Sequence, residues 1–433
     1  MRWLANLIVK AFGYRELRLV ERMKAFETLS REELRRHQLR KLNALVAHFR
    51  TYPFYARLLA DHGVAGRELT SLEELSRLPV ITKDVIMANL ATIAERPEAK
   101  LLNSTSGSTG RNFQFYQDQQ MLLWRRAANI VHMQWIGVDY WKDRKFTVWG
   151  LSPKVRRLAD LSQRLKVWLQ NGRRVQAYGL DEERCAEILR IMHRYRPAAM
   201  TAYPGYAFEL ARVGRERQIA PPQIRAVVVS GEMLLDHQRE AIEGYFACKV
   251  FNRYGSREFG SIAHQCSQGG GLHVHPGRLY VEADQQGELL ITDLNNFATP
   301  FIRYAIGDAG QVSDEPCACG RQFQSIVDLT GRTHDILRTS SGRQLPGQFW
   351  TTLSRSVPGI EEFQVVQKDA EHIELRVKAG PGYRDENEHH LHDKLRSVVG
   401  DEIAMDVVKV DSIELTAMGK RRFVIRADQE AGR

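Results

Sequence analysis

Short apolar runs alternate with helical stretches through the middle of the chain, and this alternation narrows the possible folds more than any other feature of the sequence. The runs hold the β-branched and other apolar residues that buried strands carry. Parallel strands need crossover connections, which are usually helices, so the alternation predicts a parallel sheet in an α/β layer architecture. The strand-like runs are residues 146–149, 199–202, 226–230 and 249–251, and the helical stretches are residues 181–193, 206–217 and 236–246.

The pattern changes in the C-terminal half of the chain. The stretches 278–283, 287–293 and 310–312 are short and separated by turn residues, which is typical of antiparallel strands. Beyond them, strand patterns surround a predicted helix at residues 386–399 and indicate a small α+β domain. We therefore expect a large N-terminal domain at residues 1–331 and a small C-terminal domain at residues 332–433. The strand patterns of the small domain lie at residues 361–367, 372–378 and 405–410.

The N-terminal part of the chain reads as helical. Ser30 followed by Glu33 has the pattern of a capping box at the start of a helix over residues 31–49, and Pro53 ends that helix. Residues 1–20 have apolar side chains at helical spacing among basic ones. Such a segment packs on the body of the protein or, as the alternative, rests on a membrane surface.

The charge and the cysteine content exclude several classes of protein. Lys and Arg outnumber Asp and Glu by 62 to 52, which gives a formal net charge of +10 and suits anionic ligands such as nucleotides. The chain has no recognised basic–aromatic module, so we expect no nucleic-acid partner. No apolar run approaches the ~20 residues of a membrane-spanning helix, and Arg2 and Lys10 interrupt the pattern of a signal peptide. Five cysteines do not form a disulfide framework in a chain of 433 residues, so we expect a cytoplasmic protein without a transmembrane segment.

The stretch from Ser104 to Gly110, with the sequence STSGSTG, is the first sharp motif. Glycines let the backbone turn its N–H groups toward one anion, and Ser and Thr hydroxyl groups add donors. No Lys-Ser/Thr pair follows the second glycine, and the G-x-G-x-x-G spacing is missing, so neither a Walker loop nor a dinucleotide turn is indicated. The motif predicts a phosphate site of another kind, and an exposed flexible loop is the alternative.

Four further motifs follow in order along the chain: Tyr254-Gly255-Ser256-Arg257-Glu258, Arg303-Tyr304-x-x-Gly307-Asp308, Gly331-Arg332-Thr333-His334-Asp335 and Thr416-x-x-Gly419-Lys420. With the first motif they resemble the adenylate-forming superfamily, which includes acyl-CoA synthetases, the adenylation domains of peptide synthetases and firefly luciferase. Within it the chain is most similar to the phenylacetate–CoA ligase family, and especially to the branch encoded in capsular polysaccharide clusters. Three further segments of the sequence also resemble the pattern of that family: Tyr52-Pro53-Phe54-Tyr55, Ser230-Gly231-Glu232 and Cys317-Ala318-Cys319-Gly320.

The resemblance implies a fold and a reaction. The large domain would combine parallel α/β subdomains with a small β-barrel-like subdomain, and the small mobile domain would rotate about a hinge at Asp335 between two half-reactions. A carboxylic acid would attack the α-phosphate of ATP to give an acyl-adenylate and pyrophosphate, and the thiol of coenzyme A would then displace AMP. Catalysis of such a transfer depends mainly on positioning and electrostatic stabilisation.

The same resemblance implies roles for single residues. Lys420 would contact the α-phosphate, and Glu258 would hold the Mg²⁺ that bridges phosphate oxygens. Tyr254 would pack against the adenine, Asp308 would accept hydrogen bonds from the ribose hydroxyl groups, and Arg332 would reach the ribose or a phosphate. The remaining residues of the predicted binding set are Thr105, Ser106, Gly107, Ser108, Thr109, Gly110, Ser230, Gly231, Glu232, Gly255 and Ser256.

Two positions depart from the superfamily pattern. Arg111-Asn112 follows the first motif where many relatives carry Lys or Glu and then Pro. Arg257 stands where relatives usually carry a Ser or Thr whose hydroxyl faces a nucleotide phosphate. An arginine there could pair with phosphate, pair with a substrate carboxylate or point away. Taken without the other motifs, Asp308 would read as a surface ion-pair partner of Arg303, and Lys420 as part of a basic surface.

Cysteines and histidines in the C-terminal half of the large domain suggest a metal site. A Cys-x-Cys knuckle between turn residues, with an upstream Cys and His, supplies a set for a tetrahedral structural zinc. Relatives in the phenylacetate–CoA ligase family carry a similar set, and free thiols in a turn-rich region are the alternative. The expected ligands are Cys266, His273, Cys317 and Cys319, with His264 or His275 as substitutes.

The substrate is less well defined than the nucleotide. The resemblance places the acid pocket near residues 203–206, 230–232 and 254–255, and it implies an aryl or acyl carboxylic acid. Coenzyme A is the acceptor by resemblance alone, with an amine, a sugar or a carrier protein as the alternative and a non-catalytic scaffold protein as the second. The sequence leaves the identity of the acid, the pathway and the oligomeric state open, and a homodimer is one option. Candidate aromatic walls, which could equally be core residues, are Phe115, Tyr116, Trp135 and Trp149.

Overall fold

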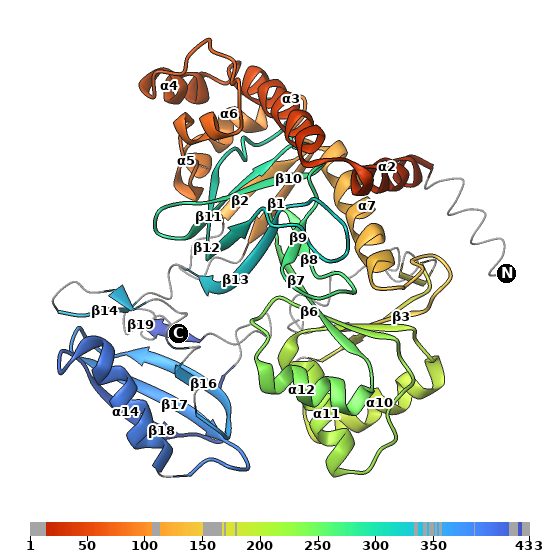
Figure 1. Ribbon diagram of the computed structural model, residues 1–433, viewed down its shortest axis with the longest axis vertical. Helices are drawn as coiled ribbons and strands as arrows, with labels where there is room; N and C mark the ends of the chain where they lie inside the picture. The colour runs from red at the N-terminus through yellow and green to blue at the C-terminus, as the bar shows by residue number, and fades with distance from the viewer. Residues whose placement is uncertain are drawn as a thin grey trace.

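The structure is a computed structural model with a large part and a small part (Figure 1). Within the described residues, the large part contains a sheet of eleven strands and the small part a sheet of four strands. None of the described helices is long and apolar enough to span a bilayer. The structure describes residues 14–105, 113–149, 167–168, 170–177, 180–332, 337–340, 344–345, 350, 353–354, 357–384, 386–414 and 423–426.

The large sheet has the strand order β10-β11-β12-β13-β9-β8-β7-β6-β5-β3-β4. In its parallel half, which runs from β7 to β4, β3, β5, β6 and β7 coincide with the strand-like runs that the sequence predicts, whereas β4 matches no predicted run. β6 is buried along its whole length, because a parallel sheet is covered on both faces. Figure 1 shows α10, α11 and α12 grouped beside this half. The bounds are β3 (Lys145–Trp149), β4 (Gly172–Gln176), β5 (Ala199–Ala202), β6 (Ala226–Ser230), β7 (Lys249–Ser256), α10 (Glu182–Tyr195), α11 (Pro204–Glu216) and α12 (Asp236–Phe246).

The other half of the large sheet is antiparallel. β7 turns through residues 257–259 into β8, and every further pair as far as β10 is antiparallel. The strands that we expected to form a β-barrel-like subdomain therefore continue the parallel sheet without a break. The bounds are β8 (Gly260–His264), β9 (Leu272–Val274), β10 (Leu279–Ala283), β11 (Glu288–Asp293), β12 (Tyr304–Ser313) and β13 (Ser325–Arg332).

Helices from the N-terminal part cover the antiparallel half. The predicted capping box at Ser30 and Glu33 is present at the start of α3, and Pro53 occupies the first turn of the following helix, where its missing N–H costs nothing. Val20 of α2 is buried in a cluster with Trp124 of α7, so this part of residues 1–20 packs on the protein. The bounds are α2 (Tyr14–Ala25), η1 (Phe26–Thr28), α3 (Arg31–Phe49), α4 (Pro53–Asp61), η2 (Glu73–Arg77), α5 (Lys83–Ala88), α6 (Leu90–Ala94) and α7 (Gln119–Trp135).

A separate hairpin carries the first motif. β1 (Leu101–Thr105) pairs antiparallel with β2 (Phe113–Gln117), and the phosphate motif begins at the end of β1. Phe115 on β2 is fully buried between Phe113 and Phe301, so it is a core residue and does not line a pocket.

The small part has its own sheet and core. Its strand order is β18-β17-β16-β19, and Leu391 and Leu395 of α14 pack with Phe363 and Val365 of β16. The division at residues 331 and 332 stays a prediction. The bounds are β14 (Leu337–Arg338), β15 (Gln344–Leu345), β16 (Ile360–Gln367), β17 (His372–Ala379), α14 (Glu386–Val399), β18 (Ala404–Lys409) and β19 (Val424–Arg426).

Candidate active site

The candidate site lies where the parallel half of the large sheet passes into the antiparallel half. β6 ends at Ser230, its neighbour β7 ends at Ser256, and the β7–β8 turn carries Glu258. Only glycine fits at Gly255, since a Cβ atom there would lie 2.5 Å from the carbonyl oxygen of Gly260. Ligand sites of open α/β sheets form beyond the carboxyl ends of the strands, and this edge has that geometry.

Two predicted nucleotide-binding residues meet at this edge. The hydroxyl group of Tyr254 donates a hydrogen bond of 2.6 Å to Oδ2 of Asp308. Asp308 is half-buried on β12, and its backbone partner on β13 is Arg332. Among the described residues, Arg303 forms an ion pair with Glu282 at 3.3 Å and none with Asp308, so the interpretation of Arg303 and Asp308 as a surface pair is wrong.

Glu288 supports the part of β12 that precedes Asp308. The amide of Gly307 donates to Oε1 of Glu288 at 3.1 Å. Burial raises the pKa of Glu288, and the nearby carboxylates of Asp284 and Asp308 add to the shift. No motif marked Glu288, because its function here is a contact with a backbone amide.

Glu258 is directed into the protein and is 5% exposed. Among the described residues, its carboxylate accepts one hydrogen bond, from the hydroxyl of Tyr304 to Oε1 at 3.4 Å. The backbone carbonyl of Glu258 accepts a bond of 2.8 Å from Nε2 of Gln117. A buried carboxylate with so long a contact has acceptor capacity left for a cation, so the residue fits the predicted magnesium ligand.

The strand that enters the phosphate motif is tied to the same turn. Nε of Arg257 donates to the carbonyl oxygen of Ser104 at 3.1 Å. Ser104 precedes Thr105, which is the last residue of β1. The predicted phosphate loop therefore begins beside the turn that carries the predicted magnesium ligand. The other residues of the loop, which lie outside the described residues, are Ser106, Gly107, Ser108, Thr109 and Gly110.

The turns predicted to line the acid pocket are in contact. The amide of Gly205 donates to Oε2 of Glu232 at 3.4 Å, which joins the turn after β5 to the turn after β6. The ring centroids of Tyr203 and Trp149 are 4.1 Å apart. Burial raises the pKa of Tyr203, and the charge of Glu232 adds to the shift. These four residues gather at the carboxyl ends of β3, β5 and β6.

A buried arginine supports the β7–β8 turn from behind. Arg278 is 1% exposed, and its two Nη atoms donate to the carbonyl oxygens of Phe259 and Ser261. Those carbonyls flank Gly260, immediately after Glu258. Arg278 belongs to no motif and its burial depends on long-range packing, so sequence patterns could not indicate its role.

The predicted zinc ligands come together in the structure. The ligand atoms of Cys266, His273, Cys317 and Cys319 all lie within 4.8 Å of one another. Sγ of Cys266 and Sγ of Cys317 are 3.8 Å apart, and Sγ of Cys319 is 3.4 Å from Nε2 of His273. A tetrahedral zinc with Zn–S of about 2.3 Å and Zn–N of about 2.0 Å separates its ligand atoms by roughly 3.5–3.8 Å. The four residues therefore fit a zinc ion.

The histidines around this cluster differ in whether their ring nitrogens are available to bind a metal ion. Burial lowers the pKa of His273 to about 4, so its ring is neutral at physiological pH, which is the form that binds metals. Both ring nitrogens of His275 have backbone partners, the carbonyl of Met23 and the amide of Gly277, which disfavours it as a substitute. Trp135 packs edge-on against His273, so it is a core residue beside the cluster and not a pocket wall.

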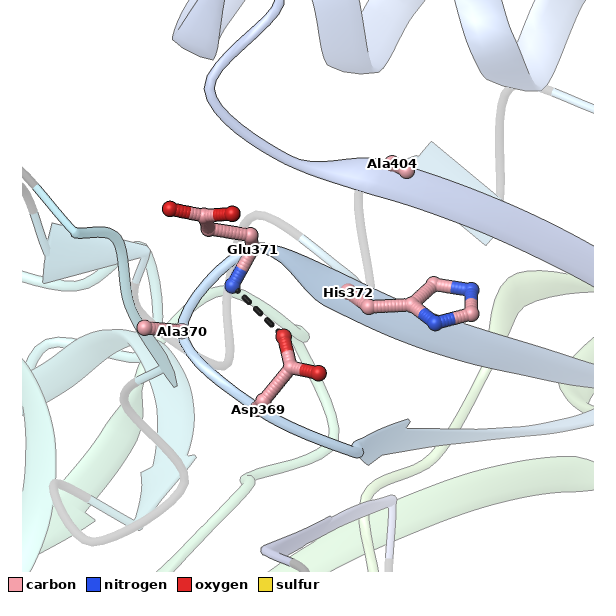
Figure 2. Close-up of a pocket in the computed structure, with 5 residues that line it drawn as sticks. All are labelled: Asp369, Ala370, Glu371, His372 and Ala404. Carbon is pink, nitrogen blue, oxygen red and sulfur yellow. Dashed lines mark hydrogen bonds between the residues drawn. The ribbon is translucent and has the colours of Figure 1, made fainter.

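A hollow on the small part is separate from the candidate site. It lies at the turn between β16 and β17, where Oδ1 of Asp369 accepts a hydrogen bond of 2.8 Å from the amide of Glu371 (Figure 2). None of the predicted site residues lines it. The residues that line it are Asp369, Ala370, Glu371, His372 and Ala404.

A family model matches the C-terminal part of the chain, and curated proteins resemble most of its length. A family model described as the CapK C-terminal domain matches residues 337–427. The chain is 25% identical over 392 residues to Protein CapK of Staphylococcus aureus, covering 86% of this chain and 84% of that protein. It is also 25% identical over 411 residues to a phenylacetate-coenzyme A ligase of Thermus thermophilus, covering 85% and 87%. These similarities support a relationship of the chain to the phenylacetate–CoA ligase-like family. The family lies in the adenylate-forming superfamily, and the similarity to two phenylacetate-coenzyme A ligases supports an AMP-forming acid–thiol ligase.

A solved structure confirms the fold class. The crystal structure of 2-hydroxyisobutyryl-CoA ligase in the postadenylation state, in complex with R3-HIB-AMP, has a TM-score of 0.74 to this chain at 20% identity. The match covers 92% of this chain and 91% of that one. The chain thus has the adenylate-forming fold that the resemblance of its motifs implied. Lys420 and Asp335 lie outside the described residues, and their roles remain predictions.

Proposed function

We propose that this chain activates an aryl or acyl carboxylic acid with ATP and then transfers the acyl group to coenzyme A. In the first step a carboxylate oxygen attacks the α-phosphorus, and the bond from that phosphorus to pyrophosphate breaks. In the second step the thiolate sulfur attacks the acyl carbon, and the bond between that carbon and the AMP oxygen breaks. The thiol proton passes to solvent or to a base.

One observation carries this proposal: Tyr254, Glu258 and Asp308 gather at one sheet edge, beside the strand that enters the phosphate loop. Asp308 binds the ribose hydroxyl groups through its carboxylate, whose position the Tyr254 hydroxyl fixes. The ring of Tyr254 flanks the adenine. Glu258 holds Mg²⁺, which when bound supplies positive charge against the phosphates.

We assign the α-phosphate contact to Lys420 and the hinge to Asp335 on the strength of the motifs. An ammonium group on the small domain can meet the α-phosphate in one orientation of that domain and leave it in another. Lys420→Ala should therefore abolish adenylate formation while nucleotide binding stays measurable. Unchanged turnover in that variant would refute the assignment.

We propose a structural role for zinc at Cys266, His273, Cys317 and Cys319. Four protein ligands leave no open coordination position, so the ion would stabilise the fold and take no part in the reaction. It would join β9 and the residues after β8 to the knuckle that precedes β13.

The acceptor remains the least constrained part of the proposal. The match of residues 337–427 to the CapK C-terminal domain keeps an amine, a sugar or a carrier protein as the alternative acceptor. A non-catalytic scaffold protein is the second alternative, with residues 1–20 as its membrane contact. The intact Glu258 and Asp308 favour catalysis over a scaffold. We place the reaction in the cytoplasm, where ATP and coenzyme A are available.

Pyrophosphate release with a panel of aryl and acyl acids, with and without coenzyme A, tests the function. We expect at least one acid to give release that coenzyme A accelerates, together with a thioester product. Release that coenzyme A leaves unchanged would indicate another acceptor. If the wild-type protein releases no more pyrophosphate with any acid than an Asp308→Asn control does, both the coenzyme A ligase and the ligase with another acceptor are contradicted.

A further inference from the structure

Arg257 and Glu258 are adjacent in the β7–β8 turn but differ in their surroundings. Glu258 is buried against Tyr304, whereas Arg257 is exposed and reaches across to the β1–β2 hairpin. There its Nε donates to the carbonyl oxygen of Ser104 at 3.1 Å. One turn therefore contacts both the predicted magnesium site and the entrance of the phosphate loop.

The bond to Ser104 uses only one of the donors of the guanidinium group. A guanidinium has five N–H donors in a planar fork, and the Nε donor is one of them. In the part of the chain that the structure describes, the two Nη atoms of Arg257 have no hydrogen-bond or ion-pair partner. The side chain is thus held at Nε beside the loop entrance, and no described residue binds its two Nη atoms.

A second arginine lies near this fork. Arg125 of α7 packs against the same turn, since a Cβ atom on Gly260 would lie 2.3 Å from Cδ of Arg125. Burial lowers the pKa of Arg125, and the charges of Arg126 and then Arg257 add to the shift. No described carboxylate forms a salt bridge with Arg125 or Arg257. Two guanidinium groups near each other without such a partner favour the binding of an anion.

We propose that Arg257 binds a phosphate group of the nucleotide while it holds the strand that enters the phosphate loop. Its Nε–H fixes the carbonyl of Ser104, and its Nη donors bind oxygens of the β- or γ-phosphate of ATP, which become pyrophosphate oxygens after the first step. A guanidinium binds phosphate in a bidentate way that neither a hydroxyl nor an ammonium group reproduces. This inference rests on the proposed function, because it requires ATP at this edge of the sheet.

Direct binding of ATP and of pyrophosphate, measured by titration calorimetry without any acid, tests the inference. Arg257→Gln removes the charge and the fork, so we expect both dissociation constants to rise about tenfold. Arg257→Lys keeps the charge without the fork, so we expect an intermediate rise of about threefold. Arg225→Gln is the matched control: Arg225 is an exposed arginine paired with Asp143, and its loss should leave both constants unchanged.

Two results would overturn the inference alone. The first is that the wild-type protein binds ATP and the Arg257→Gln variant binds ATP and pyrophosphate as tightly as the wild type does. The other is a variant in which only the KM for the acid rises, which would assign Arg257 to a substrate carboxylate. A wild-type protein that binds neither ATP nor pyrophosphate would instead contradict the proposed function, and the inference with it. Thermal melting of each variant checks that the fold is retained.

Discussion

The hydroxyl group of Tyr254 donates a hydrogen bond of 2.6 Å to Oδ2 of Asp308. The two residues belong to β7 and β12, which are not neighbours in the sheet. The bond joins the ring predicted to flank the adenine to the carboxylate predicted to bind the ribose. The positions of these two groups are therefore coupled before any nucleotide is bound.

Tyr254→Phe should weaken ATP binding and leave the acid unaffected. The substitution keeps the ring but removes a bond to a charged group, which is worth about 1.5–3 kcal/mol. We expect the KM for ATP to rise about tenfold in steady-state kinetics, since 1.4 kcal/mol corresponds to a factor of ten. The matched control is Tyr245→Phe on α12, which removes a hydroxyl that donates to the carbonyl of Ile219 at 2.9 Å. Equal effects of the two substitutions would contradict the coupling.

Arg278→Met should destabilise the large part of the protein. It leaves the carbonyls of Phe259 and Ser261 without their buried donor and removes the positive charge near the buried Asp293. Breaking such a buried charged contact costs about 3–5 kcal/mol in the free energy of unfolding, measured by urea denaturation. Arg278→Lys should recover part of the loss, and Arg225→Met on the surface should cost less than about 0.5 kcal/mol. A loss below about 1 kcal/mol for Arg278→Met would show that the turn does not depend on this contact.

Purified protein prepared without chelators should contain about one zinc per chain by elemental analysis. Cys317→Ser or Cys319→Ser should lose the metal and lower the melting temperature, because a structural zinc contributes directly to folding. Cys248→Ser is the control, since Cys248 lies outside the cluster. A wild-type protein without zinc, or equal zinc loss in the control, would argue against the site.

The sequence predicted local structure better than the pairing of strands. The helices over residues 236–246 and 386–399 match their predicted bounds, because periodicity and end signals act within the helix itself. The continuity of the large sheet could not be predicted. It depends on the pairing of β9 with β13, through Ser325 and His273, and alternation along a strand does not specify a distant partner.

In the candidate site, too, some residues could be predicted from the sequence and others could not. Asp308, Glu258 and the Cys/His cluster could be singled out as candidates because the predicted chemistry requires particular residue types in recognisable motifs. Arg278 and Gln117 could not, because each acts through a backbone carbonyl that any residue supplies. For Arg257 the sequence left three options, and the contact with Ser104 shows that the side chain turns toward the phosphate motif.

Acid-dependent exchange of labelled pyrophosphate into ATP tests most directly whether this sheet edge forms an acyl-adenylate. The exchange reports the first step alone and needs no acceptor. We expect exchange with at least one aryl or acyl acid, dependent on Mg²⁺ and reduced about 100-fold or more in Asp308→Ala and Lys420→Ala. A wild-type protein that supports no exchange with any acid, or an Asp308→Ala variant that exchanges at the wild-type rate, would contradict the assignment of the site.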